Sequence, residues 1–202
     1  MSADPRIVKD AEQLTTVTYE EICNLTNEGA KIIHPRAVEI AMEKQIPIRV
    51  RSTFDQGDGT LVTTSESMLE YSVESELTDR IITGITSISN LAQVKVNFGD
   101  QTNNQRILFF KKLADKQITV DFINIASLDT AFTVASKDLN KLKEILAELG
   151  YKPIIRENCA KVSIVGAGIA GAPGLMAQII ETLKQEDIEI IQSNDSHTSI
   201  GI

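Results

Sequence analysis

Apolar and polar positions along this chain alternate between the period of a strand and the period of a helix. The clearest unit runs from residue 159 to residue 193. It opens on a β-branched apolar run around Val162, which is typical of a buried strand. Apolar residues then recur at helical spacing through residues 175–183, and residues 188–191 predict a second strand. The unit therefore has the order strand, turn, helix, strand.

An earlier stretch of the chain repeats this order. Residues 92–96 (AQVKV) match residues 160–164 (AKVSI), and a polar turn, a helix pattern and a strand pattern extend from there to Phe122. Leucines at helical spacing between residues 139 and 149, ended by Gly150, predict one more helix. A β–turn–α–β unit thus occurs twice, which indicates a duplicated module.

The two copies differ in their turns. Gly166, Gly168 and Gly171 satisfy G-x-G-x-x-G after a strand, with acidic residues about 20 positions on, as in dinucleotide-binding turns at helix N-termini. The alternative is a strand–loop–helix that packs a small α+β module and holds a small effector. Pro173 suits the first turn of the next helix. Because the first copy lacks the motif, the motif cannot be what the repeated unit is for.

The residues ahead of the repeats predict helices and an edge strand. Thr18 followed by Glu21 predicts a helix start with a capping box, and Gly29 predicts its end. Residues 46–53 alternate like a strand at a sheet edge. Lys31 lies in a segment of small residues, where a lysine serves either as a point charge for a phosphate or as an ordinary surface side chain.

Composition and charge narrow the function classes. A chain of 202 residues with 42% hydrophobic residues allows one or two globular domains. The net charge of −8 and the pI near 4.9 argue against a nucleic-acid partner. Cys23 and Cys159 lack metal or redox spacing, and neither a signal peptide nor an apolar run of ~18 residues is visible. We therefore expect a cytoplasmic protein with no membrane partner and no metal site of its own.

Short motifs across the chain resemble the aspartokinases, in the order in which that family has them. The motifs similar to the closing part of the aspartokinase catalytic domain are Ala3-Asp4-Pro5-Arg6, Gly29-Ala30-Lys31, His34-Pro35-Arg36-Ala37, Ile46-Pro47-Ile48, Arg51-Ser52-Thr53 and Gly59-Thr60. Residues 81–202 resemble the paired ACT regulatory domains of the family. Three motifs most resemble the diaminopimelate-sensitive aspartokinase of spore-forming Gram-positive bacteria: Phe122-Ile123-Asn124-Ile125, Cys159-Ala160-Lys161-Val162 and Gln192-Ser193-Asn194-Asp195-Ser196-His197-Thr198.

The resemblance implies an α+β fold. The end of an amino-acid-kinase α/β domain is expected at residues 1–65, with a linker at residues 66–80. Tandem ferredoxin-like (βαββαβ) ACT domains are then expected at residues 81–158 and 159–202, the second of them incomplete.

The resemblance also implies an activity. Aspartokinases transfer the γ-phosphoryl group of ATP, with Mg²⁺, to the β-carboxylate of L-aspartate, at the start of lysine, threonine, methionine and diaminopimelate biosynthesis. Arg6, Ala30 and Lys31 are expected at the ATP, because phosphoryl transfer depends on positioning and charge neutralisation. The Lys-Phe-Gly-Gly-Thr-Ser loop of the family is absent from these 202 residues. No catalytic residue is therefore assigned, and the 202 residues alone are expected to be inactive.

The ACT modules are expected to bind an amino-acid effector, which would be diaminopimelate, lysine or threonine, and to form a homo-oligomer. Where the family usually has an Asp-x-Pro-Gly effector loop, the first copy departs from it after Asp100, and the second keeps Pro173-Gly174. The candidate effector residues are Asp100, Asn124, Pro173, Gly174 and Ser193. Two alternatives stay open: a stand-alone ACT regulatory subunit made from an internal start, and a dinucleotide-binding oxidoreductase.

Overall fold

The structure, a computed structural model, describes residues 1–54, 57–67, 81–99 and 102–202. The chain divides into two compact units, one made of residues 1–87 with 162–202 and the other of residues 88–161. Two long strands, β4 (Gly84–Asn97) and β7 (Ile154–Val165), contribute residues to both units. Most of the expected linker lies outside the described residues, and the expected domain boundaries remain predictions.

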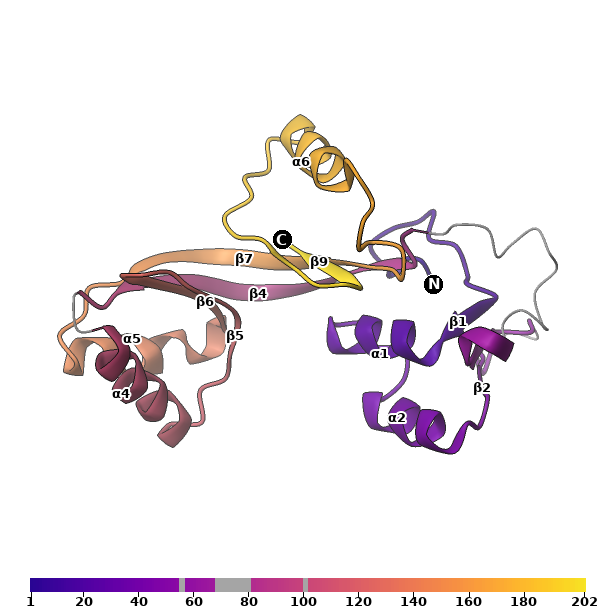
Figure 1. Ribbon diagram of the computed structural model, residues 1–202, viewed down its shortest axis with the longest axis horizontal. Coiled ribbons are helices and arrows are strands. Elements are labelled where there is room, and N and C mark those ends of the chain that lie inside the picture. Colours follow the sequence, from indigo (N-terminus) through magenta and orange to yellow (C-terminus); the bar gives the residue numbers. More distant parts are fainter. Residues whose placement is uncertain (55–56, 68–80, 100–101) are drawn as a thin grey trace. The chain divides into compact units, whose positions relative to one another are not determined.

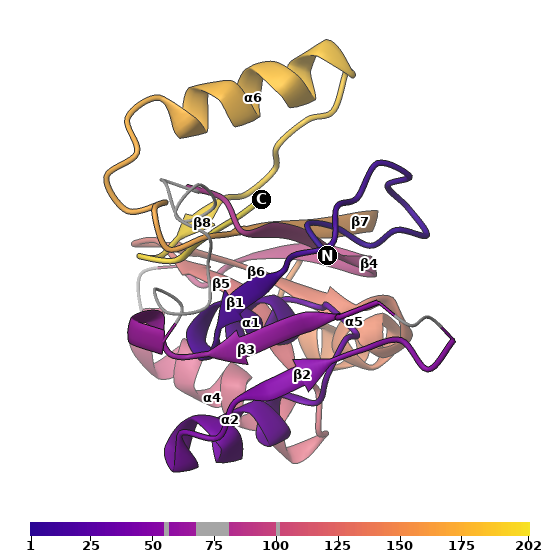
Figure 2. The same cartoon turned by 90° about the vertical axis from the view of Figure 1, so that its right-hand side faces the viewer.

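The first unit opens with a small sheet and two helices (Figure 2). The sheet has the order β1-β3-β2, in which β1 is parallel and β2 antiparallel to β3. The elements are β1 (Thr16–Thr18), α1 (Tyr19–Asn27), α2 (Pro35–Lys44), β2 (Ile48–Val50) and β3 (Thr60–Thr63).

Local sequence signals explain where the two helices begin. Thr18 caps α1: its hydroxyl accepts from the Glu21 amide, and the Glu21 carboxylate accepts from the Thr18 amide at 2.8 Å. This is the predicted capping box. Helix α2 begins after His34, whose Nδ1 accepts from the Arg36 amide, with Pro35 in the first turn. Both helices pack on a core of buried residues that contains Val17, Ile22, Leu25, Val38, Val62 and Val165.

The rest of the first unit is built on the end of β7. It contains α6 (Leu175–Gln185), β8 (Asn194–Asp195) and β9 (Ser199–Gly201), and the strand order here is β7-β9-β8. Buried aliphatic side chains join α6 to these strands; they are Ile164, Ile169, Leu175, Ile179 and Ile200. Figure 1 shows α6 standing over the strand pair β7 and β9.

Two local predictions in this region are wrong. Residues 188–191 form no strand, and the next strand after α6 begins only at Asn194. The reason is the helix end: the Ile188 amide donates to the Leu183 carbonyl at 2.9 Å and Asp187 has φ of +56°, which turns the chain there. Pro173 also precedes the helix rather than entering its first turn, because Gly174, at φ of +84°, is the N-cap residue.

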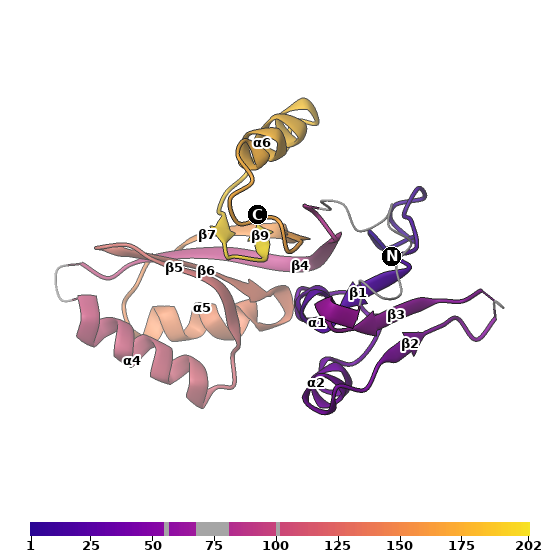
Figure 3. The ribbon, with the colours of Figure 1, turned by 45° about the vertical axis from the view of Figure 1, so that its right-hand side comes forward.

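The second unit is a sheet with the order β5-β6-β4-β7 and two helices on one face, as Figures 1 and 3 show for α4 and α5. Its remaining elements are α4 (Thr102–Asp115), β5 (Val120–Ile125), β6 (Asp129–Ala135), the 3₁₀ turn η1 (Ser136–Asp138) and α5 (Leu139–Glu148). Fully buried side chains from every layer form its core, among them Val94, Phe109, Phe132, Leu142 and Leu146. The predicted strand–helix–strand unit and the predicted helix before Gly150 are confirmed.

Strand β5 is irregular at its centre. Its pairing with β6 shifts between Asp121 and Asn124, and Phe122 has φ of +55°, a conformation rare for a bulky residue. The buried Lys161 side chain supports the bulge, since its Nζ lies 3.0 Å from Asp121 Oδ2 and 5.3 Å from the centre of the Phe122 ring.

Candidate functional site

Arg6, a predicted ATP residue, is held by a carboxylate two positions earlier. Its Nη2 lies 2.7 Å from Asp4 Oδ2, and its Nε lies 3.0 Å from Asp4 Oδ1. The Arg6 backbone amide donates to the same Oδ1 at 2.9 Å. These side-chain and backbone hydrogen bonds from Arg6 lower the pKa of Asp4 from 3.8 to about 2. The guanidinium is thus oriented by its partner, although its side chain is 76% exposed.

Lys31, the second predicted cation, acts on the same carboxylate. Its charge contributes to the lowered pKa of Asp4, although less than the Arg6 contacts do. The two predicted cations thus act on one carboxylate, Arg6 by direct contact and Lys31 through its charge alone. Sequence reasoning did not single out Asp4, although its spacing from Arg6 was a usable signal. The backbone amide of Ala30, the third predicted ATP residue, donates to the Leu25 carbonyl at 2.8 Å. Its N–H is therefore occupied, and a ligand would have to contact other atoms of Ala30.

Glu28, which lies just before Gly29-Ala30-Lys31, is fixed from two sides. It ends α1, and its carboxylate accepts from Ser163 Oγ of β7 at 2.5 Å. Its backbone carbonyl accepts from Thr86 Oγ1 of β4 at 2.7 Å. One turn earlier, Asn24 Nδ2 donates to Thr198 Oγ1 at 3.0 Å. The C-terminal end of α1 is thus tied by side-chain hydrogen bonds to β4, to β7 and to the residue that precedes β9.

The glycine motif has a structural explanation. A Cβ on Gly166 would lie 2.0 Å from the Ile81 carbonyl oxygen, and one on Gly168 would lie 2.9 Å from the Ile81 Cα. Real side chains cannot approach so closely, so glycine is required here by the neighbouring backbone of the same chain. Gly171 has φ of +88°, which favours glycine for its own conformation. The glycines at these positions are therefore explained by the fold of the chain itself, without a bound pyrophosphate. The dinucleotide interpretation loses the support of the motif.

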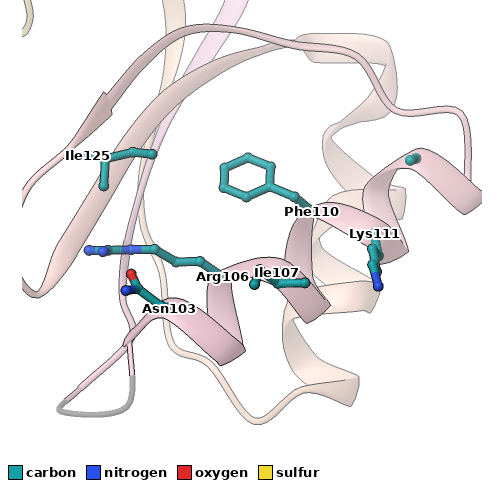
Figure 4. Close-up of a pocket in the computed structure, with 7 residues that line it drawn as sticks. Asn103, Arg106, Ile107, Phe110, Lys111 and Ile125 are labelled. Atoms are coloured by element: carbon teal, nitrogen blue, oxygen red, sulfur yellow. The ribbon is translucent and has the colours of Figure 1, made fainter.

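An open groove of about 670 Å³ lies on the second unit, between α4 and β5. Figure 4 shows Arg106 and Phe110 rising from the helix and Ile125 facing them from the strand, while Lys111 points away from Ile125. Asn103, Ile107 and Ala114 complete the lining. The groove is mainly apolar, and two cationic residues, Arg106 and Lys111, belong to its lining.

Arg106 is nearly buried, with 8% exposure, and it closes the turn between β5 and β6. Its Nε donates to Thr130 Oγ1 at 3.1 Å, and its Nη2 donates to the Ala126, Ser127 and Asp129 carbonyls. The guanidinium also lies 5.7 Å from the centre of the Phe98 ring. Because these contacts occupy it, Arg106 serves mainly to shape the groove.

The predicted effector residues lie in separate places. Asn124 is exposed on β5, next to Ile125 of the groove, and Pro173 and Gly174 are exposed ahead of α6. Ser193 lines a different cavity of about 440 Å³, beside the α6 residues Met176, Ile180 and Lys184. Asp100 lies outside the described residues. Within the described chain, these residues do not form one pocket.

Metal-binding clusters and membrane-spanning helices are both missing from the part of the chain that the structure describes. No group of three or more His, Cys, Asp or Glu side chains there could hold a metal ion. Among the same residues, no helix combines the length and the apolar character that crossing a bilayer requires.

Comparison with known proteins adds to this geometry. The amino acid kinase family matches residues 1–52, and the ACT domain family matches residues 154–202. Aspartokinase 1 of Bacillus subtilis (strain 168) is 46% identical over 202 residues, which are 100% of this chain and 49% of that protein. The chain is thus similar to aspartokinases along its whole length. It spans about half the length of the curated aspartokinases it matches.

Solved aspartokinase structures share the fold. Clostridium acetobutylicum aspartate kinase matches with a TM-score of 0.85 at 21% identity, over 100% of this chain and 47% of that one. E. coli aspartokinase III in complex with aspartate and ADP matches with a TM-score of 0.75 at 21% identity. This match covers 99% of this chain and 45% of that one. The same enzyme in complex with lysine and aspartate matches with a TM-score of 0.73 at 21% identity. This match covers 100% of this chain and 45% of that one. The predicted α+β fold, a kinase-domain end followed by ACT domains, is confirmed.

The same comparisons also bear on the two alternatives. The B. subtilis aspartokinase aligns over all 202 residues, including residues 1–52 that match the amino acid kinase family. A stand-alone ACT subunit is therefore not favoured. An oxidoreductase is not supported either, because neither family match is a dinucleotide-binding family.

Proposed function

We propose that this chain forms the nucleotide-contacting and regulatory end of an aspartokinase, which phosphorylates the β-carboxylate of L-aspartate at the expense of ATP. The reaction would open the biosynthesis of lysine, threonine, methionine and diaminopimelate. The observation that supports this most directly is that Arg6 contacts Asp4 and that the charge of Lys31 also acts on this carboxylate. E. coli aspartokinase III, whose fold this chain shares, has been solved with aspartate and ADP.

The residues present suit an ATP phosphate chain. Arg6 offers a planar fork of N–H donors and Lys31 a compact positive charge, and both are exposed. Phosphoryl transfer needs such groups to position and neutralise the phosphates. Mg²⁺ commonly binds through substrate phosphates and one or two carboxylates, and Asp4 is the carboxylate at this cluster. When a phosphate approaches, Arg6 would exchange part of its contact with Asp4 for the ligand.

The ACT modules would supply regulation by an amino acid. The E. coli aspartokinase III structure with lysine makes an amino-acid effector a reasonable expectation. Asn124, next to the groove between α4 and β5, and Ser193, in the cavity beside α6, are the candidate contacts. We also propose that the modules pair in a homo-oligomer.

Calorimetric titration with Mg·ADP tests the nucleotide site directly. We expect saturable binding to the chain, weakened at least about tenfold in Arg6→Ala and in Lys31→Ala, since each removes one of two phosphate contacts. Lys44→Ala is the matched control, because Lys44 is an exposed cation paired with Glu43 in the same unit. Equal affinity in all four proteins would contradict the proposed site. Parallel titrations with diaminopimelate, lysine and threonine would identify the effector.

A further inference from the structure

Glu28, two residues before Ala30, is attached by hydrogen bonds to both β4 and β7. Glu28 accepts hydrogen bonds through its carboxylate from Ser163 and through its backbone carbonyl from Thr86. It is followed by Gly29, which has φ of +109° and turns the chain toward Ala30 and Lys31. Glu28 therefore ties the chain to β4 and β7 just before the predicted nucleotide contacts.

We propose that Ser163 and Thr86 are positioning residues, which set the place of Lys31 at the nucleotide by holding Glu28 from two neighbouring strands. This inference rests on the proposed nucleotide site and adds residues that lie outside it. Neither Ser163 nor Thr86 belongs to the kinase-like residues 1–52. The proposal thus gives the ACT strands a defined effect on nucleotide affinity.

The burial of these groups supports a holding role. Ser163 is 1% exposed, so its hydroxyl has little water to replace the Glu28 carboxylate if that contact is lost. Ser163 is also fixed in the sheet, because it pairs with Gly201 of β9. Hydrogen bonds to a charged acceptor are shorter and stronger than neutral ones, and the 2.5 Å distance fits this class.

The two strands also make the contact suitable for regulation. β4 begins at Gly84 and β7 ends at Val165, so Thr86 and Ser163 lie near strand ends. Both strands continue in sequence through residues of the second unit, where Asn124 and the groove are located. A shift of either strand along its axis would change a hydrogen bond to Glu28 and thereby move Lys31.

The test measures Mg·ADP affinity together with amide hydrogen exchange in the full 202-residue chain. The variants are Ser163→Ala and Thr86→Val, with Ser87→Ala as the control, since Ser87 is an exposed neighbour on β4. We expect each variant to raise the Kd for Mg·ADP about three- to tenfold, a change typical of one lost hydrogen bond. The Ala30 amide should exchange faster, whereas the Ala37 amide in α2 should not change. Ser87→Ala should alter neither measurement.

The outcomes separate this inference from the proposed function. If the unchanged chain binds no Mg·ADP, the proposed nucleotide site fails and this inference fails with it. If the unchanged chain binds and both variants bind equally well, only the positioning role is overturned. If the variants lower the melting temperature but leave the Kd for Mg·ADP and the Ala30 amide exchange unchanged, Ser163 and Thr86 contribute only to stability, and the positioning role is overturned. An affinity for Mg·ADP in Ser163→Thr that is close to that of the unchanged chain would support the proposal, because threonine keeps the hydroxyl that Ser163→Ala removes.

Discussion

At the scale of single residues, the Asp4–Arg6 pair shows how a local motif creates an ordered charge. Asp4 accepts from the Arg6 side chain and amide, and Lys31 adds its charge to the same group. An aspartate two positions before an arginine can be read in a sequence, but whether the charge of Lys31 also acts on it depends on how α1 packs. This is why the sequence predicted the two cations separately and could not predict their common partner.

The lowered pKa of Asp4 gives a prediction about pH. Because the folded-state pKa is about 2 and the usual value is 3.8, the pair stabilises the fold fully above pH 3.8. That contribution is lost as the pH falls from 3.8 through about 2. We expect the Asp4 carboxyl carbon to titrate near pH 2 by NMR, and closer to its usual pKa in Arg6→Gln, which keeps the backbone hydrogen bond but removes the charged partner. An unshifted midpoint in the unchanged chain would contradict the pairing.

At the scale of elements, sequence patterns predicted periodic segments well and segments fixed by long-range packing poorly. The capping box at Thr18 was predicted because all its partners lie within one turn. The strand expected at residues 188–191 was wrong, because three isoleucines within four positions do not reveal which backbone they can pair with. The glycine motif was ambiguous for the same reason, since Ile81 approaches it from far away in the sequence.

The close approach of Ile81 to Gly166 predicts a large effect of one methyl group. Gly166→Ala would place Cβ against a backbone carbonyl that cannot rotate away, so we expect a loss of about 2–3 kcal/mol in unfolding free energy. Chemical denaturation measures this loss. Ala170→Ser, at an exposed position in the same loop, should change the stability by less than about 0.5 kcal/mol.

The same glycine loop gives a prediction about dinucleotides. If the motif bound a dinucleotide, NAD or NADP would quench the fluorescence of the unchanged chain saturably, and Gly168→Val would abolish the effect. We expect no saturable quenching in either protein, because Gly166 and Gly168 serve backbone packing.

At the scale of the whole molecule, the exposed apolar residues of the second unit predict self-association. β5 ends the strand order, so its outer edge can pair with another strand. Near it, Ile107 is 54% and Ile125 is 59% exposed. Burying such side chains contributes at most about 1.5–3 kcal/mol each, less the entropy lost on association. Screening over about 8 Å at physiological salt limits the repulsion between acidic chains.

Sedimentation velocity at micromolar concentrations tests this prediction. We expect a dimer for the unchanged chain and a shift toward monomer in Ile125→Asp. Ile154→Asp is the matched control, because Ile154 is 64% exposed but lies on β7, at the opposite end of the strand order in this unit. A monomeric unchanged chain, or equal dissociation in both variants, would contradict association through β5.

The division of the chain into one continuous and one interrupted unit has a consequence for folding. Residues 88–161 are contiguous, so their contacts can form as soon as that stretch exists. The other unit needs residues 162–202 to return to residues 1–87, across a long intervening stretch. Within residues 88–161, β4 pairs with β7, which brings the two ends of this stretch, and so residues 87 and 162, close together. The chain loop that the interrupted unit must still close is then shorter. We therefore expect the contiguous unit, residues 88–161, to gain hydrogen-exchange protection first, and the interrupted unit to complete its core only afterwards.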